Sequence, residues 1–178
     1  SLMPFIKKEI SKIATQGDTI IDIFAGSGSV SSGLKNDYRI IANDAEKYSS
    51  AITSALLNTP NREDLIEVKE KILSSYSENV KEGLLDKNIM LEKDFIDKGD
   101  NAALEALYSN LPSVWNESVF PGFLRKAKQY NLFKYYYSGT YFSLSQSVEI
   151  DAIIKCISDV ALDTKDVLFS CLFFAMKE

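Results

Sequence analysis

Two apolar runs joined by a glycine turn constrain the fold of this chain more than any other feature. Residues 19–24 read Thr-Ile-Ile-Asp-Ile-Phe and residues 38–42 form a second apolar run, so each predicts a buried parallel strand, covered on both sides. Between them, Gly26 and Gly28 permit a sharp turn into a short helix, and Asp44 follows the second strand. This order of elements predicts a pocket for a nucleoside-bearing cofactor.

The residue types in this motif favour S-adenosylmethionine over a dinucleotide. Asp44 is placed to accept hydrogen bonds from ribose hydroxyls, and Asp22 lies inside the first strand, where it suits the ammonium group of a methionine moiety. Ser31 occupies the position of the third glycine of a dinucleotide fingerprint. The helix that begins near Ser29 directs its free N–H groups toward the same pocket. The alternative is a tight turn that binds no ligand.

Helical patterns dominate the rest of the chain. Apolar residues at helical spacing predict helices at residues 2–16, 48–56, 143–160 and 164–175, and residues 62–82 and 100–110 are predicted to form polar, solvent-facing helices. Two capping boxes are predicted, one from Asn43 to Glu46 and one from Ser143 to Gln146. The pattern therefore predicts half of a doubly wound α/β sheet in residues 1–60 and a mainly helical region in residues 61–178.

Composition narrows the chemistry of the 178-residue chain. The absence of histidine removes the commonest general base and metal ligand, and Cys156 and Cys171 lie in apolar helical sequence without metal-binding spacing. We expect both thiols in the core, no metal site, and a reducing, cytoplasmic environment. The longest apolar run, residues 167–176, is shorter than the roughly 20 residues a membrane helix needs, so we expect no membrane association. A net charge of −5 counts mildly against nucleic-acid binding by this segment alone.

Two blocks of sequence resemble one enzyme family. The first comprises residues 22–31, Asp-Ile-Phe-Ala-Gly-Ser-Gly-Ser-Val-Ser, with Lys35 and residues 41–49. The second comprises residues 135–146 and continues into residues 150–153, Ile-Asp-Ala-Ile. Both are similar to segments of the FxGxG-type adenine-specific DNA methyltransferases of bacteria and phages, and they stand in the order found in that family.

The resemblance implies an α/β, Rossmann-like S-adenosylmethionine-dependent methyltransferase fold, present in part, with a mainly helical insertion. In this family the glycine turn binds S-adenosylmethionine, so Asp22 would face its amino group and Asp44 would hold its ribose. The residues implied to wrap the methionine and the ribose are Phe24, Ala25, Gly26, Ser27 and Gly28.

The resemblance also indicates which part of the enzyme is missing. The family's catalytic motif is an acid, amide or serine followed by Pro-Pro and an aromatic residue, and it binds an adenine flipped out of the duplex. The four prolines, Pro4, Pro60, Pro112 and Pro121, are not adjacent to one another. We therefore assign no catalytic residue, and we expect a middle portion of the enzyme that does not methylate DNA by itself.

Basic and aromatic residues alternate near residues 125–142. The candidates for nucleic-acid contact are Arg125, Lys126, Lys128, Lys134 and Tyr137. Such residues can pair with phosphates and stack on bases. The alternative is that the tyrosines anchor a strand or helix while the lysines face solvent. The resemblance favours DNA, because target recognition in the family lies between the cofactor and catalytic motifs.

The expected function is therefore a segment of a DNA adenine-N6 methyltransferase of a restriction-modification system or a phage. Double-stranded DNA is the expected partner of the full-length protein, and a restriction endonuclease is a candidate second partner. Two alternatives stay open. One is a non-catalytic cofactor-binding or helical interaction module, and the other is a methyltransferase that acts on RNA or a small molecule.

Overall fold

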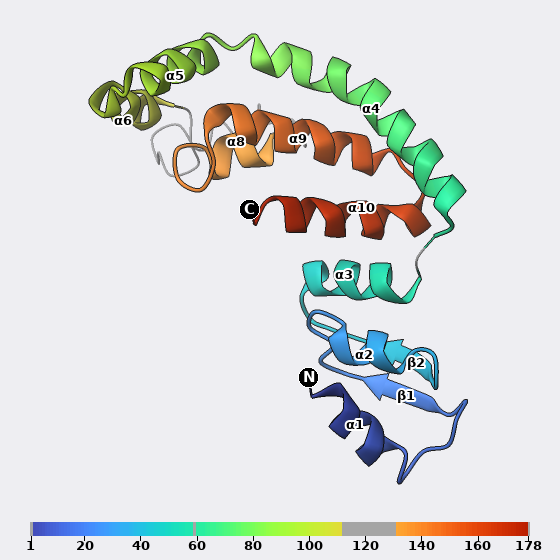
Figure 1. The fold of residues 1–178 in the computed structure, drawn as a ribbon. Helices are drawn as coiled ribbons and strands as arrows, with labels where there is room; N and C mark the ends of the chain where they lie inside the picture. The colour runs from blue at the N-terminus through green and yellow to red at the C-terminus, as the bar shows by residue number, and fades with distance from the viewer. Residues whose placement is uncertain (1, 59, 112–130, 178) are drawn as a thin grey trace. The chain divides into compact units, whose positions relative to one another are not determined.

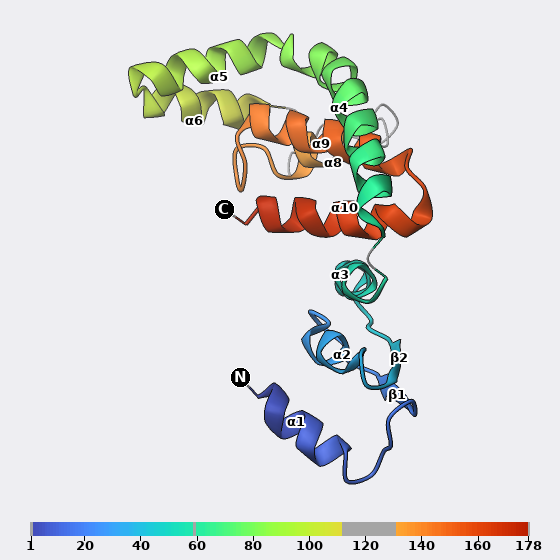
Figure 2. The same ribbon diagram turned by 45° about the vertical axis from the view of Figure 1, so that its right-hand side comes forward.

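The computed structural model divides the chain into two compact units. Unit 1 comprises Ser1–Ile66 and Val160–Glu178, and unit 2 comprises Glu67–Asp159. Within the described residues the chain is mostly helical, with one two-stranded parallel sheet (Figures 1 and 2). The described residues are 2–58, 60–111 and 131–177.

Unit 1 contains the predicted strand, helix and strand. Its elements are α1 (Met3–Ile10), β1 (Thr19–Asp22), α2 (Ser29–Leu34), β2 (Arg39–Ala42), α3 (Lys47–Leu57) and α10 (Leu162–Ala175). β1 and β2 pair in parallel with Ile20 opposite Ile40, and α2 is the crossover between them. In Figure 1, α3 lies between α10 and the layer formed by α2 and the sheet. The βαβ order predicted from the sequence is confirmed.

One face of this sheet is uncovered in the part of the chain that the structure describes. Ile20 and Ile40 are half-buried, whereas Ile21 and Ile41 on the opposite face are 62% and 52% exposed. The apolar runs predicted strands covered on both sides. That expectation is wrong for unit 1 as described, because α2 packs against β2 while Ile21 and Ile41 stay more than half exposed.

Two local predictions in unit 1 need correction. The first helix ends at Ile10 rather than near residue 16, and the chain turns where the N–H and hydroxyl of Thr15 both bond to the Asp18 carboxylate. The predicted capping box at Asn43 does not form, because α3 begins later and Glu46 itself is the residue that precedes it. Short polar side chains such as Asp18 offer the backbone local bonds that compete with a longer helix.

Unit 2 is a set of packed helices. Its elements are α4 (Arg62–Leu84), which begins in unit 1, α5 (Lys87–Lys98), α6 (Asn101–Asn110), α8 (Leu132–Tyr136) and α9 (Leu144–Ser158). Leu144, Val148 and Ala152 on one side of α9 pack with Val80 of α4 and Ile89 of α5 in its core. The predicted capping box at the start of α9 is confirmed.

The predicted division at residue 60 assigned the last helix to the helical region. In the structure, α10 instead packs on α3 and belongs to unit 1. The predicted roles of residues 1–60 in cofactor binding and of residues 61–178 in target recognition stay predictions.

The two cysteines differ in burial. Cys156 is buried and accepts a hydrogen bond from Asn79 at 3.1 Å, as expected of a core thiol, whereas Cys171 is exposed and the prediction for it is wrong. Among the described residues, no cluster of cysteine and acidic side chains is arranged to hold a metal ion. No described helix is both long enough and apolar enough to cross a bilayer.

Candidate functional site

The turn between β1 and α2 is held by backbone hydrogen bonds. The Ala25 N–H donates to the Asn43 carbonyl at 3.0 Å, and the Gly28 N–H donates to the Ala25 carbonyl at 2.8 Å. Gly26 and Gly28 have φ values of 52° and 70°, a left-handed conformation that glycine adopts without steric cost. The two glycines therefore occupy the two positions of the turn that require a left-handed backbone conformation.

Asp44 lies just after β2, and its carboxylate binds the glycine turn. The N–H of Gly26 donates to Oδ2 at 2.8 Å, and the N–H of Glu46 donates to Oδ1 at 2.9 Å. The N–H groups of Glu46 and Gly26 lower the pKa of Asp44, so the side chain is ionised at neutral pH. Each carboxylate oxygen still has a lone pair that can accept a hydrogen bond from a hydroxyl group.

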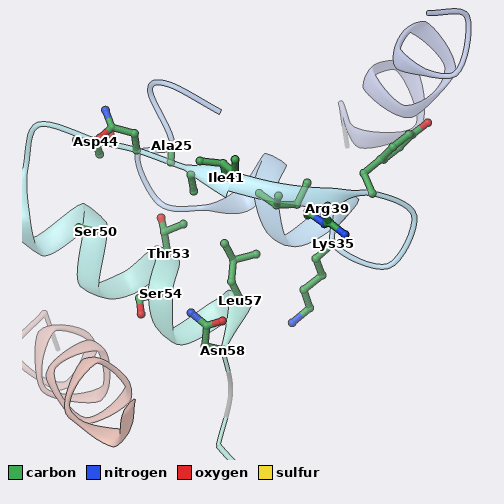
Figure 3. A pocket seen from close by; sticks show the side chains of 14 residues that line it. Ala25, Lys35, Arg39, Ile41, Asp44, Ser50, Thr53, Ser54, Leu57 and Asn58 are labelled. Carbon is green, nitrogen blue, oxygen red and sulfur yellow. The ribbon is translucent and has the colours of Figure 1, made fainter. Parts of the chain in front are cut away.

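A cavity of about 520 Å³ extends from Asp44 along β2 (Figure 3). Figure 3 shows Asp44 and Ala25 at one end and Lys35 and Arg39 at the other. One side of α3 and Asn58, the residue that follows the helix, form the wall opposite β2. The lining residues of α3 are Ser50, Thr53, Ser54 and Leu57. This volume lies in the range of small-molecule sites, and its ends carry opposite charges.

Five of the seven predicted cofactor residues do not line the cavity: Asp22, Phe24, Gly26, Ser27 and Gly28. Asp22 accepts a hydrogen bond from the Ser31 hydroxyl at 2.6 Å, which ties β1 to α2. Phe24 is 84% exposed, and the hydroxyls of Ser27 and Ser29 are hydrogen-bonded to each other at 2.9 Å. The cofactor roles of all seven predicted residues stay predictions: Asp22, Phe24, Ala25, Gly26, Ser27, Gly28 and Asp44.

Sequence reasoning missed the contribution of α3 to the site. Thr53 is buried, and its hydroxyl donates to the Gly26 carbonyl over a long 3.4 Å. Ser49, one turn earlier on the same face, is also buried. The signal available in the sequence was two pairs of small polar residues four positions apart, Ser49 with Thr53 and Ser50 with Ser54, among the apolar residues of this helix. Lys35 and Arg39, which supply the positive end of the cavity, were missed as well.

Three of the predicted nucleic-acid contacts, Arg125, Lys126 and Lys128, lie outside the described residues. The fourth, Lys134, forms an ion pair with Asp86 at 2.9 Å, and both side chains are mostly buried. Burial alone would raise the pKa of Asp86. The hydrogen bond from the backbone N–H of Asn88 and the ion pair with Lys134 outweigh burial, so the pKa of Asp86 is lowered. Lys134 therefore stabilises the junction of α5 and α8.

The fifth candidate, Tyr137, belongs to an aromatic cluster. Its ring lies 5.1 Å from that of Phe133 and 6.0 Å from that of Tyr141, centroid to centroid. Tyr141 itself is 80% exposed. The packing of Tyr137 agrees with the alternative that tyrosines anchor this segment, and its role in DNA contact stays a prediction, like that of Lys134.

Comparisons with known proteins find relatives of the chain. The family model described as D12 class N6 adenine-specific DNA methyltransferase matches residues 1–160. The modification methylase LlaI of Lactococcus lactis subsp. lactis is 42% identical over 60 residues, which are 33% of this chain and 10% of that protein. The matched stretch thus spans about a tenth of the length of this curated relative. No solved structure matches the chain.

Proposed function

The chain belongs to the D12 class of N6 adenine-specific DNA methyltransferases, and from this premise we propose that it carries part of the enzyme's S-adenosylmethionine site. The complete enzyme would transfer a methyl group from this cofactor to adenine in double-stranded DNA. The observation that supports the proposal most directly is the hydrogen bond from Gly26 to Asp44 at one end of the cavity. It joins the glycine turn and the strand-end acid into one site.

The residues at this site fit the chemistry of the cofactor. S-adenosylmethionine supplies a sulfonium methyl group that a nitrogen nucleophile can accept. In the proposed site, the ionised Asp44 would accept hydrogen bonds from the ribose hydroxyls, and Asp22 would face the ammonium group. Gly26 leaves room for a ligand to approach the backbone closely, because a Cβ added there would meet nothing within 4 Å. The contribution of this chain would be to bind and orient one of two reactants.

We propose further that unit 1 is part of a Rossmann-like sheet. β1 and β2 run parallel with a helix as crossover, which is the repeating element of that fold. A two-stranded sheet is too small to be stable alone, and parallel sheets are normally covered on both faces. The exposed Ile21, which does not line the cavity, therefore supports further strands and a helix on the open face in the complete enzyme.

Unit 2 would contribute to target recognition, with residues 125–137 as the proposed DNA-contacting segment. A role in restriction-modification is supported by the printed name of the relative, a modification methylase. A restriction endonuclease partner and a cytoplasmic location complete the proposal. These last two points rest on the sequence resemblance and on the few cysteines.

The cofactor site can be tested with Asp44→Asn and Asp44→Ala in the full-length protein. Loss of the charge-assisted hydrogen bonds to the ribose should raise the Kd for S-adenosylmethionine roughly tenfold to a hundredfold in calorimetry. Asp37→Asn is the matched control, because Asp37 is an exposed acid of unit 1 paired with Lys7. We expect its Kd to equal that of the wild type.

Two different results would contradict the proposal, one for the role of Asp44 and one for methyl transfer. Equal affinity in the wild type and Asp44→Asn would remove Asp44 from the site. Cofactor binding without transfer of a labelled methyl group to adenine in duplex DNA would favour a non-catalytic cofactor-binding module.

A further inference from the structure

We propose that Thr53 is a positioning residue that fixes the glycine turn of the cofactor site. This inference rests on the proposed S-adenosylmethionine site and extends it to α3. Thr53 is 3% exposed and is one of the α3 residues that line the cavity. It would act through the turn rather than through a role in methyl transfer.

The first observation is the close approach of Thr53 to both glycines. Its hydroxyl donates to the Gly26 carbonyl at 3.4 Å. A Cβ added to Gly28 would lie 2.8 Å from Oγ1 of Thr53 and 3.1 Å from its Cα. Real Cβ atoms essentially never approach within 3.0 Å of another heavy atom, so α3 packs against the turn as tightly as glycine allows.

The second observation is that Gly26 is held from two elements. Its N–H donates to the Asp44 carboxylate after β2, and its carbonyl accepts the Thr53 hydroxyl from α3. Backbone hydrogen bonds hold Ala25 and Gly28, whereas these two side-chain contacts hold the Gly26 peptide between them. Because glycine has a wide choice of backbone conformations, the two contacts restrict the orientation of this peptide beside Asp44.

The third observation concerns the opposite side of α3. Helix α10 packs on α3 within unit 1, so α3 lies between α10 and the layer that contains the glycine turn (Figures 1 and 2). The position of Thr53 is therefore set by a packed helix rather than by a loop. A site supported in this way holds its geometry before the ligand arrives.

The experiment compares three variants of the full-length protein. Thr53→Val keeps the shape of the side chain and removes the donor, whereas Thr53→Ser keeps the donor. Tyr48→Phe is the control, since it removes a hydroxyl from an exposed residue of the same helix that does not line the cavity. Calorimetry gives the Kd for S-adenosylmethionine, and hydrogen exchange by NMR gives the opening rate of the Gly26 amide.

Loss of a neutral hydrogen bond should raise the Kd about fivefold in Thr53→Val, while Thr53→Ser stays within about twofold of the wild type. The Gly26 amide, which Asp44 holds, should exchange several times faster in Thr53→Val without cofactor. In a double-mutant cycle with Asp44→Asn, the two effects on Kd should be less than additive, since both act on Gly26.

A Thr53→Val protein with wild-type Kd and wild-type Gly26 exchange would overturn the inference. An equal loss of affinity in Tyr48→Phe would also overturn it, because the effect would then follow from loss of any hydroxyl of α3 and not from the bond to Gly26. Failure of the wild type to bind S-adenosylmethionine is a separate result that refutes the proposed function. Faster Gly26 exchange in Thr53→Val would even then support the role of Thr53 in holding the turn, and unchanged exchange would refute it.

Discussion

Asp151 is a buried carboxylate that binds the start of a helix to which it does not belong. The N–H groups of Phe133 and Lys134 each donate to it at 2.9 Å, so this residue of α9 holds the first turn of α8. Burial raises the pKa of Asp151 to about 6, although these N–H groups act in the opposite direction. One side chain thus couples helix packing in unit 2 to pH.

The sign of this coupling gives a prediction for Asp151→Asn. The folded protein holds the Asp151 proton up to about pH 6, whereas the unfolded chain loses it near the ordinary value of 3.8. The contribution to stability is therefore fully present below pH 3.8 and is lost as pH rises toward about 6. The free energy of unfolding of the wild type minus that of Asp151→Asn should fall across this window and then level off.

Urea unfolding of both proteins at a series of pH values measures this difference. Glu149→Gln serves as the control, because Glu149 is an exposed acid on the same helix. A difference that stays constant, or that increases with pH, would contradict the assignment of the titration to Asp151.

At the scale of elements, unit 2 is joined by carboxylates that satisfy helix ends on neighbouring helices. Glu92 of α5 is 1% exposed and accepts hydrogen bonds from the Tyr108 hydroxyl of α6 at 2.6 Å and from the N–H groups of Leu144 and Ser145 at the start of α9. Burial and the bond to Glu92 raise the pKa of Tyr108, which therefore remains a donor. Three helices depend on this one acid.

We therefore expect Glu92→Gln to destabilise unit 2. The amide offers one acceptor oxygen instead of two and leaves a buried donor without a partner, which costs about 1–3 kcal/mol. Chemical denaturation measures the loss, and Glu105→Gln at an exposed position of α6 is the control. Equal stability of Glu92→Gln and the wild type would show that the helix ends find other acceptors.

In the whole molecule, α10, the last helix that the structure describes, belongs to the first unit. α10 packs on α3, although about a hundred residues of unit 2 separate them in sequence. Phe169 and Phe173 stack within α10 with their ring centroids 6.2 Å apart. Unit 1 is therefore assembled from both ends of the chain, and unit 2 is an insertion within it.

This arrangement predicts the effect of shortening the chain after Asp159. Removal of α10 uncovers α3, so hydrogen exchange in α3 and proteolysis of residues 1–66 should both become faster, while residues 67–159 keep their protection. A chain that lacks only residues 176–178 is the control, because α10 ends at Ala175. Unchanged exchange in α3 would show that the rest of unit 1 holds this helix.

Much of the cofactor region could be predicted from local sequence. The parallel strands, the glycine turn and the strand-end acid follow from apolar runs and turn chemistry within residues 19–44, and the structure has them in that order. The limits of the elements were less predictable. The first helix and the start of α3 differ from expectation because Asp18 and Asp44 bond to nearby backbone N–H groups.

Local sequence specifies the family, the βαβ order and the capping box at Ser143, since each depends on residues close together in the chain. Which polar groups meet depends instead on how the helices pack. Thr53 and Gly26 are 27 positions apart, and Lys134 and Asp86 are 48 apart. Such pairs form only when helices pack, because packing brings distant residues together and desolvates them, and no local periodicity encodes that choice.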